Sequence, residues 1–157
     1  MPYENLDDPA AAGGRIHFRH READDDPAGY VTPATLAAKG IAFAYVDATR
    51  VDEYEALNSL GQQLRTDHPP YDPAPPVGID GWFRFMDDLE TMADRETGMV
   101  IVIDKAAALF ADARSWVFKL ISVWVLQLPR WQRRKAPCHL AFQMEANDAV
   151  EQIYGPK

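Results

Sequence analysis

The chain has 157 residues, 47% of them hydrophobic and 25% charged, which is the composition of an ordinary globular domain. Its net charge of −8 argues against general nucleic-acid binding, which needs a basic surface, and suits a domain that meets a cationic partner. The lone Cys138 excludes an internal disulfide, residues 1–14 do not form a signal peptide, and the longest apolar stretch, 116–128, is too short to span a bilayer. We therefore expect a cytoplasmic protein without membrane contact.

The first forty residues hold few strong structural signals. Residues 1–14 are acidic and rich in Pro, Ala and Gly, which is typical of a loose lead-in. Residues 15–22 alternate weakly between apolar and polar and are predicted as an added edge strand. The stretch 32–40 is predicted as a short helix that begins at Thr32 and stops at Gly40.

Three continuous apolar runs of strand length predict three buried strands, at 41–46, 99–104 and 138–144. Because helical patterns separate them, these strands should pair in parallel with helices on both faces. We expect a small three-layer α/β domain with a three-stranded parallel sheet and no second domain. The predicted limits are a partly flexible N-terminal extension (1–30), the domain (31–150) and a C-terminal tail (151–157).

Four helical patterns follow the first of these strands. Residues 52–64 form the first, since Asp52 and Glu55 have capping-box spacing. After a loop with five prolines in residues 65–78, an acidic helix is predicted with Asp80 as its N-cap. The last two patterns are a short helix at 105–113 and a long helix at 114–135 that Pro129 should kink.

The acidic helix begins in the stretch GIDGWFRFMDDLETM, residues 78–92. On a helical wheel extended to residue 96, an apolar face gathers around Trp82, Phe85 and Leu89. A second stripe combines one aromatic residue with three acids: Phe83, Asp87, Glu90 and Asp94. Neither Glu90 nor Asp94 has a base three or four residues away. An aromatic residue beside unpaired charge is typical of a binding surface, although a solvated face of an acidic protein gives the same pattern.

Charge is also divided between two long segments of the chain. Residues 66–98 carry eight acids and two bases, whereas residues 113–138 carry six bases and no acid. Such a polarised field would steer a basic partner toward the acidic pole.

The order of these pieces resembles the barstar family of ribonuclease inhibitors. The matching stretches are FAYVDATRVDEYEALNSLGQQL, GWFRFMDDL, MVIVIDKAAALF and PRWQRRKAPCHLAF, between about residues 41 and 144. The resemblance implies a small parallel α/β domain that plugs the active site of a toxin with an acidic helix and the preceding loop. Gly81 and Phe83 depart from the family pattern, which places an Asn and an acid there.

The resemblance also assigns contact residues. Asp87, with Asp80 or Asp72, would occupy the phosphate sites of a ribonuclease through charge-assisted hydrogen bonds. Phe83 and Tyr71 would fill or rim the base site, and Glu90 and Asp94 would extend the acidic surface.

Other candidate sites carry weaker signals. His17 and His20, or the loop 67–72, could suggest a metal site, but the spacing in an extended segment does not converge well. Cys138 starts a buried strand and is read as a core residue. The basic stretch 129–135 complements a helix C-terminus more readily than it binds RNA.

Three functions remain open from the sequence. The first is a bacterial immunity protein of a toxin–antitoxin type, a monomer that inhibits a cognate basic toxin, expected to be a nuclease, one-to-one. The second is a barstar-like regulatory or scaffolding module that binds another basic protein. The third is a small enzyme that uses the His- and Asp-containing loop at 67–72. The first implies no catalysis, no cofactor, no metal and no direct nucleic-acid contact.

Overall fold

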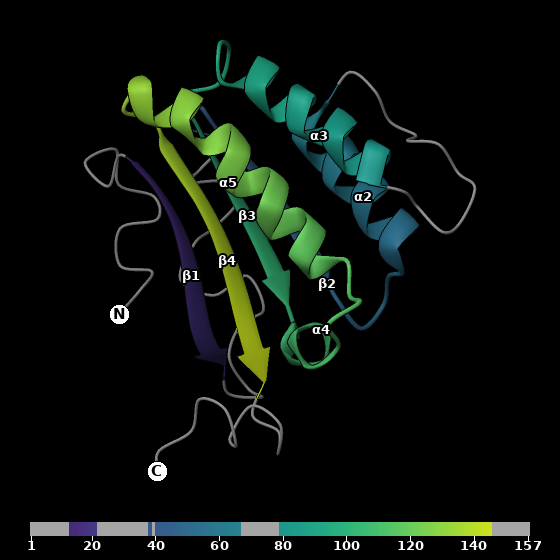
Figure 1. The fold of residues 1–157 in the computed structure, drawn as a ribbon. Helices are drawn as coiled ribbons and strands as arrows, with labels where there is room; N and C mark the ends of the chain where they lie inside the picture. The colour runs from purple at the N-terminus through teal and green to yellow at the C-terminus, as the bar shows by residue number, and fades with distance from the viewer. Residues whose placement is uncertain (1–12, 22–37, 39, 67–78, 146–157) are drawn as a thin grey trace.

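The fold is that of a computed structural model, which describes residues 13–21, 38, 40–66 and 79–145 (Figure 1). Four parallel strands form one sheet in the order β1-β4-β3-β2. The strands are β1 (Gly13–Arg21), β2 (Ile41–Asp47), β3 (Gly98–Asp104) and β4 (Pro137–Glu145). None of the helices in the described ranges is both long and apolar enough to cross a membrane.

The predicted α/β class with a parallel sheet is confirmed. The three apolar runs become β2, β3 and β4, and all seven residues of β3 are buried, as a strand covered on both faces requires. The weakly alternating stretch near the N-terminus becomes β1, which pairs with β4 along its whole length. Part of the predicted extension at 1–30 thus belongs to the same sheet as the rest of the chain.

The chain reverses its direction of travel across this sheet. β1 and β2 lie at the two edges of the sheet, and the later strands then step back from β2 through β3 to β4. In parallel α/β sheets, ligands bind beyond the carboxyl ends of the strands, near the point where the direction reverses. The carboxyl edge of the sheet is therefore the first place to look for a site.

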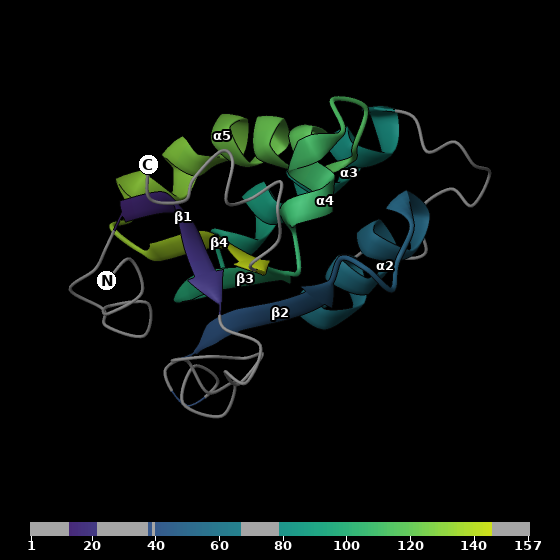
Figure 2. The ribbon, with the colours of Figure 1, turned by 90° about the horizontal axis from the view of Figure 1, so that it is seen from below.

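Four helices connect the strands in the described part of the chain: α2 (Glu53–Leu64), α3 (Ile79–Met92), α4 (Ala107–Ala111) and α5 (Val117–Arg133). The large helices α2, α3 and α5 lie on one side of the sheet (Figure 2). Helix α2 packs mainly on β2, α5 packs on β1 and β4, and α3 packs mainly on α5. Together they bury the main apolar core, which includes Trp82, Trp124 and Trp131.

The opposite face of the sheet carries a smaller apolar cluster. Its buried members are Ile41, Val100, Val102 and Ala141, with Phe43 and Tyr45 packed at its margin. All of these residues come from strands. The helix predicted at 32–40, which would add the third layer, lies almost wholly outside the described residues, and so do residues 67–78 of the Pro-rich loop.

Helix α2 forms as its sequence predicts. The Asp52 carboxylate accepts the Glu55 N–H at 2.8 Å, which satisfies one of the free donors of the first turn. The helix ends at Arg65, whose φ of 58° is left-handed, a conformation that usually favours Gly. Arg65 tolerates this conformation at a cost of about 1 kcal/mol because its N–H closes the last turn onto Gly61 and Gln62.

A single carboxylate joins the three large helices. Glu53 Oε2, at the start of α2, accepts hydrogen bonds at 2.8 Å from both Trp82 Nε1 of α3 and Lys119 Nζ of α5. The Trp82 ring stacks on Trp116 at 6.0 Å with an interplanar angle of 9°. Glu53 therefore fixes the corner where the helices meet.

Two expectations about the acidic helix are wrong. Asp80 is not the N-cap, since α3 begins at Ile79 and Asp80 lies inside its first turn. The helix ends at Met92, because the chain turns at 93–95 to enter β3, so Asp94 does not continue the helical stripe. Pro129 lies within α5, which continues to Arg133.

Candidate functional site

The carboxyl edge of the sheet holds two aspartates side by side. Asp47 ends β2 and Asp104 ends β3, and the two residues are partners in the register of the parallel pair. The polar groups that follow them come from the turn after β2 and from Lys105. These residues form the carboxyl-edge cluster: Tyr45, Asp47, Thr49, Asp104 and Lys105.

Asp104 is fully buried, and donors from the chain meet both of its oxygens. The Tyr45 hydroxyl donates to Oδ2, and the Lys105 N–H donates to Oδ1 at 2.9 Å. A buried carboxylate needs such partners because desolvation of an unpaired charge is costly. Lys105 reaches this position with a left-handed φ of 55°.

Asp47 is held by a second set of donors. The Thr49 N–H and hydroxyl both donate to Oδ1, at 2.9 and 2.7 Å. Lys105 Nζ lies 3.4 Å and Arg50 Nε 3.6 Å from Oδ2. Partial burial by itself raises the pKa of Asp47, but the Thr49 hydrogen bonds and the Lys105 charge outweigh it, so the pKa lies below its ordinary value of 3.8.

The cluster is therefore neutralised within the chain. Lys105 donates to Asp104 with its backbone and pairs with Asp47 through its side chain, so one residue bridges both carboxylates. All four carboxylate oxygens face a donor or a cation of the protein. Over the described ranges, no group of three or more His, Cys, Asp or Glu side chains is arranged to hold a metal ion.

The predictions from sequence missed this cluster, although the sequence carries a signal for it. Each of the first two buried strands is followed at once by an aspartate, in AYVD and VIVID. Parallel strands of equal register bring such residues together at one edge. The roles of Tyr45 and Lys105 depend on tertiary contacts and leave no mark in the sequence.

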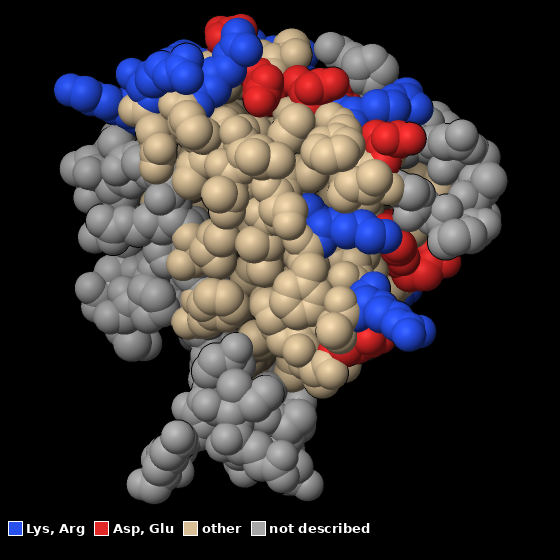
Figure 3. All heavy atoms as spheres, viewed as in Figure 1, with Lys and Arg blue, Asp and Glu red and all other residues tan. Residues whose placement is uncertain are grey.

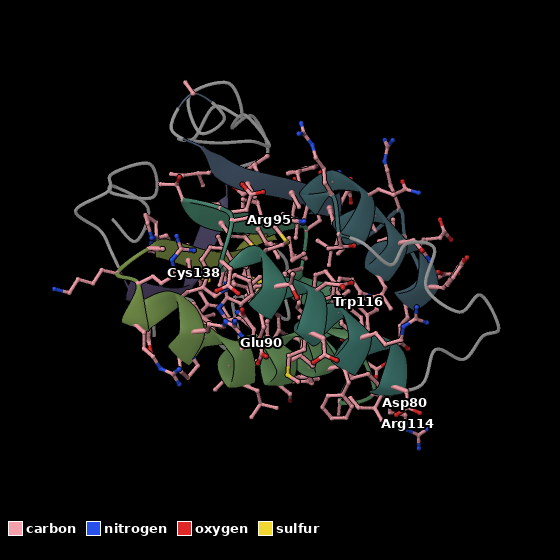
Figure 4. The ribbon with its side chains drawn as sticks, turned by 90° about the horizontal axis from the view of Figure 1, so that it is seen from above. Asp80, Glu90, Arg95, Arg114, Trp116 and Cys138 are labelled. Carbon is pink, nitrogen blue, oxygen red and sulfur yellow. The ribbon has the colours of Figure 1, made fainter. Side chains whose placement is uncertain are left out.

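Four of the residues predicted as a partner-binding surface, Asp80, Phe83, Asp87 and Glu90, lie along α3, and Asp94 lies in the turn after it. Phe83 and Asp87 are exposed on α3, Glu90 is half-buried, and Asp80 is exposed in the first turn. Asp80 lies at the outer end of α3, whereas Glu90 lies between α3 and α5 (Figure 4). Tyr71 and Asp72 are outside the described residues.

The acidic stripe receives a base from another helix. Arg130 of α5 donates to Asp94 at 2.6 Å, and Arg134 donates to the Glu96 carbonyl at 3.3 Å. Lys and Arg side chains gather over the C-terminal end of α5, next to acidic side chains (Figure 3). The two oppositely charged segments of the sequence thus meet within the molecule at this end.

The buried thiol of Cys138 is structural in character. Cys138 is a free, buried thiol on β4, and burial raises its pKa beyond the physiological range even though Gln127 hydrogen bonds with it. A thiol in this state is a weak nucleophile. This agrees with its interpretation as a core residue.

Comparison with known proteins relates the fold to ORC2 of Aeropyrum pernix. The structure of its ADPNP-ADP complexes matches with a TM-score of 0.56 and 15% sequence identity, over 92% of this chain and 39% of that one. Its ADP form matches with a TM-score of 0.58 and 15% identity, over 97% and 42%. The chain thus spans about two-fifths of the length of ORC2. No protein-family model and no curated protein matches the chain.

These findings overturn the resemblance to barstar. Two solved structures that match are of ORC2, and no family model supports a barstar relationship. The interpretation as an immunity protein that inhibits a nuclease toxin is therefore wrong, and the comparisons do not support the barstar-like scaffolding module either. The error has a physical cause, because alternating strands and helices are common to many α/β domains and do not encode strand order. At 15% identity the match to ORC2 establishes a shared fold.

Proposed function

We propose that this chain is a non-catalytic domain that has the fold of a nucleotide-binding protein but works without a nucleotide. The ORC2 structures that it resembles are complexes with ADP or with ADPNP and ADP, so an adenine nucleotide is the ligand to test first. The observation that carries the proposal is the carboxyl-edge cluster, in which both aspartates are engaged by donors of the chain.

The residues present do not fit a nucleotide phosphate chain. Phosphates are held by a Gly-rich loop of backbone N–H groups, a lysine and a magnesium ion. The sequence has no GxxxxGK pattern followed by Ser or Thr. The segment after β1, residues 22–40, carries four acids against the single base Lys39, which is the wrong charge for a polyphosphate.

The same cluster is a poor centre for hydrolysis. A general base must lie within hydrogen-bond reach of the attacking water, and Asp104 is fully buried. The Asp104 oxygens accept from Tyr45 and Lys105, and those of Asp47 face Thr49, Arg50 and Lys105. Releasing Asp47 would leave the Lys105 ammonium without its partner. These contacts support a structural role for both aspartates.

We also propose a cytoplasmic location for the domain. Its one cysteine, Cys138, is a buried free thiol and makes no use of an oxidising compartment.

The proposal is tested by thermal unfolding of the full chain with and without about 1 mM Mg-ADP or Mg-ATP. A ligand present at about 100 times its Kd adds roughly 2.7 kcal/mol to the free energy of unfolding, which raises the Tm by several degrees. We expect an unchanged Tm with either nucleotide and no phosphate release from ATP above a protein-free control. A raised Tm that Asp104→Asn abolishes, or phosphate release that this variant abolishes, contradicts the proposal.

A further inference from the structure

The free edge of strand β2 exposes hydrogen-bonding groups of its backbone. β2 is the last strand of the sheet, so only one of its sides faces a neighbour, β3. Along a strand, the N–H and C=O of successive residues point alternately to the two sides. Tyr45 and Asp47 point outward, since Tyr45 bonds with Gln63 and the Asp47 carbonyl accepts the Arg50 N–H at 3.1 Å. By the same alternation, Phe43 and Ile41 present their backbone groups outward.

Gln63 of α2 already imitates a neighbouring strand at one position of this edge. Its side-chain Oε1 accepts the Tyr45 N–H and its Nε2 donates to the Tyr45 carbonyl, both at 2.8 Å. A second hydrogen bond, from Nε2 to Ser59 Oγ at 2.8 Å, holds the amide in place. The edge at Tyr45 is therefore closed, and no described group meets the outward N–H and C=O of Phe43.

A groove runs beside the open part of the edge. It has a volume of about 400 Å³ and is lined by Gly40–Phe43 on β2, by Gln63–Arg65 at the end of α2 and by Glu96. The open stretch Ile41–Phe43 thus has room beside it for a further backbone.

The groove also has a cation. Arg65 is exposed at its wall, and its guanidinium pairs with no carboxylate in the described part of the chain. The groove lining contains one acid, Glu96. Its Oε1 lies 3.7 Å from Arg95 Nε, so Glu96 pairs with Arg95. An acidic group entering the groove would find an unpaired base at the end of α2.

We propose that this groove binds an extended segment of a partner protein, which adds a strand to β2 by pairing with Phe43 and places an acidic side chain against Arg65. Backbone pairing at an open sheet edge is a common mode of peptide recognition, and an edge of this kind is otherwise prone to unspecific pairing. This inference goes beyond the proposed function and does not depend on the carboxyl-edge cluster.

The test uses the full chain and synthetic peptides of about six residues, a usual strand length. The probe alternates Thr and Val around one central Glu, and its control is the same peptide with N-methylated backbone amides. Amide chemical shifts of the labelled protein report binding. We expect saturable shifts at Ile41–Phe43 and Arg65, with binding weakened roughly fivefold for each hydrogen bond lost by methylation. Absence of shifts, or equal binding of the methylated peptide, overturns the proposal.

Two variants distinguish strand pairing of the peptide with β2 from nonspecific contact with the groove. Arg65→Gln should weaken the Glu peptide several-fold and leave a Gln version of the peptide unchanged, whereas Arg114→Gln, an exposed change outside the groove, should affect neither. Gln63→Ala uncovers the Tyr45 backbone groups and should strengthen peptide binding several-fold. Unaltered binding in both Arg65→Gln and Gln63→Ala overturns the proposal. So does a dimer of the unmodified chain in light scattering that Phe43→Pro abolishes, since the occupant would then be a second copy.

Discussion

The side-chain amide of Gln63 donates to the carbonyl and accepts from the N–H of Tyr45, as a paired strand would. One residue of α2 thereby closes part of the sheet edge and ties the helix to β2. The hydroxyl of the same Tyr45 bonds with Asp104 at the carboxyl edge. Tyr45 thus connects the edge of the sheet with the acidic cluster.

Replacing Gln63 with Ala should lower the free energy of unfolding by about 1–2 kcal/mol. The N–H and C=O of Tyr45 would lose their hydrogen bonds to the Gln63 amide and would bond with water instead. The neighbouring exposed residue Gln62 makes no side-chain hydrogen bond within the described ranges, so Gln62→Ala is the matched control and should change stability by less than about 0.5 kcal/mol. Urea unfolding measures both. Equal effects of the two variants would show that the Gln63 amide adds nothing.

Replacing Tyr45 with Phe should lower the free energy of unfolding by about 1–3 kcal/mol, because a fully buried carboxylate loses a donor. Tyr54→Phe is the control, since the Tyr54 hydroxyl has no hydrogen bond within the described part of the chain. Chemical unfolding followed by circular dichroism compares the two. Equal stability of Tyr45→Phe and Tyr54→Phe would show that the Tyr45–Asp104 hydrogen bond does not stabilise the carboxyl-edge cluster.

Glu53 should contribute more to the free energy of unfolding than its half-buried position suggests. Glu53→Ala removes the acceptor of two donors, Trp82 Nε1 and Lys119 Nζ, and should cost about 2 kcal/mol. The tryptophan emission should change as well, since the buried Trp82 loses its hydrogen bond. Glu55→Ala, on the exposed side of the same first turn, is the control and should be close to neutral. A neutral Glu53→Ala would contradict the view that this carboxylate joins the helices.

The pH dependence of stability should carry a contribution from Asp47. Its pKa is lower in the folded state than the ordinary value of 3.8, so the ionised form is stabilised by folding. This contribution is fully present above the unfolded pKa and is lost as the pH falls through the folded one. Urea midpoints should therefore fall less between about pH 5 and pH 2 in Asp47→Asn than in the unmodified chain.

Thr49→Val gives an independent check of that pH dependence. The change removes the hydroxyl bonded to Asp47 Oδ1 and keeps the backbone N–H, so the acid-induced loss of stability should shrink in part. A titration identical to that of the unmodified chain in both variants would exclude Asp47 as its source.

The sequence predicted the elements of the fold better than their arrangement. The apolar runs identified β2, β3 and β4, and the spacing of Asp52 and Glu55 identified the start of α2. Both are local signals that arise from burial and capping. Strand order and the placement of α3 against α5 depend on contacts distant in sequence, which a pattern along the chain does not encode.

The candidate site was harder to predict for the same reason. Asp94 has no base three or four residues away in the sequence, but Arg130 of α5 lies against it in the folded chain. The pair is largely exposed and is worth at most about 1 kcal/mol, yet it removes one of the charges that had suggested a basic partner. Gln63 and Lys105 act through side chains that reach another element, and their sequence neighbours do not mark them.

The most direct test of a nucleotide-independent function is an amide spectrum of the isotopically labelled full chain, titrated with Mg-ADP. The resonances of Thr49, Lys105 and Ala106 at the carboxyl edge should stay in place, because Asp47 and Asp104 are already bound by the chain's own donors. Saturable movement of these three resonances, absent in Asp104→Asn, would show a nucleotide site at this edge and would contradict the proposed nucleotide-independent function.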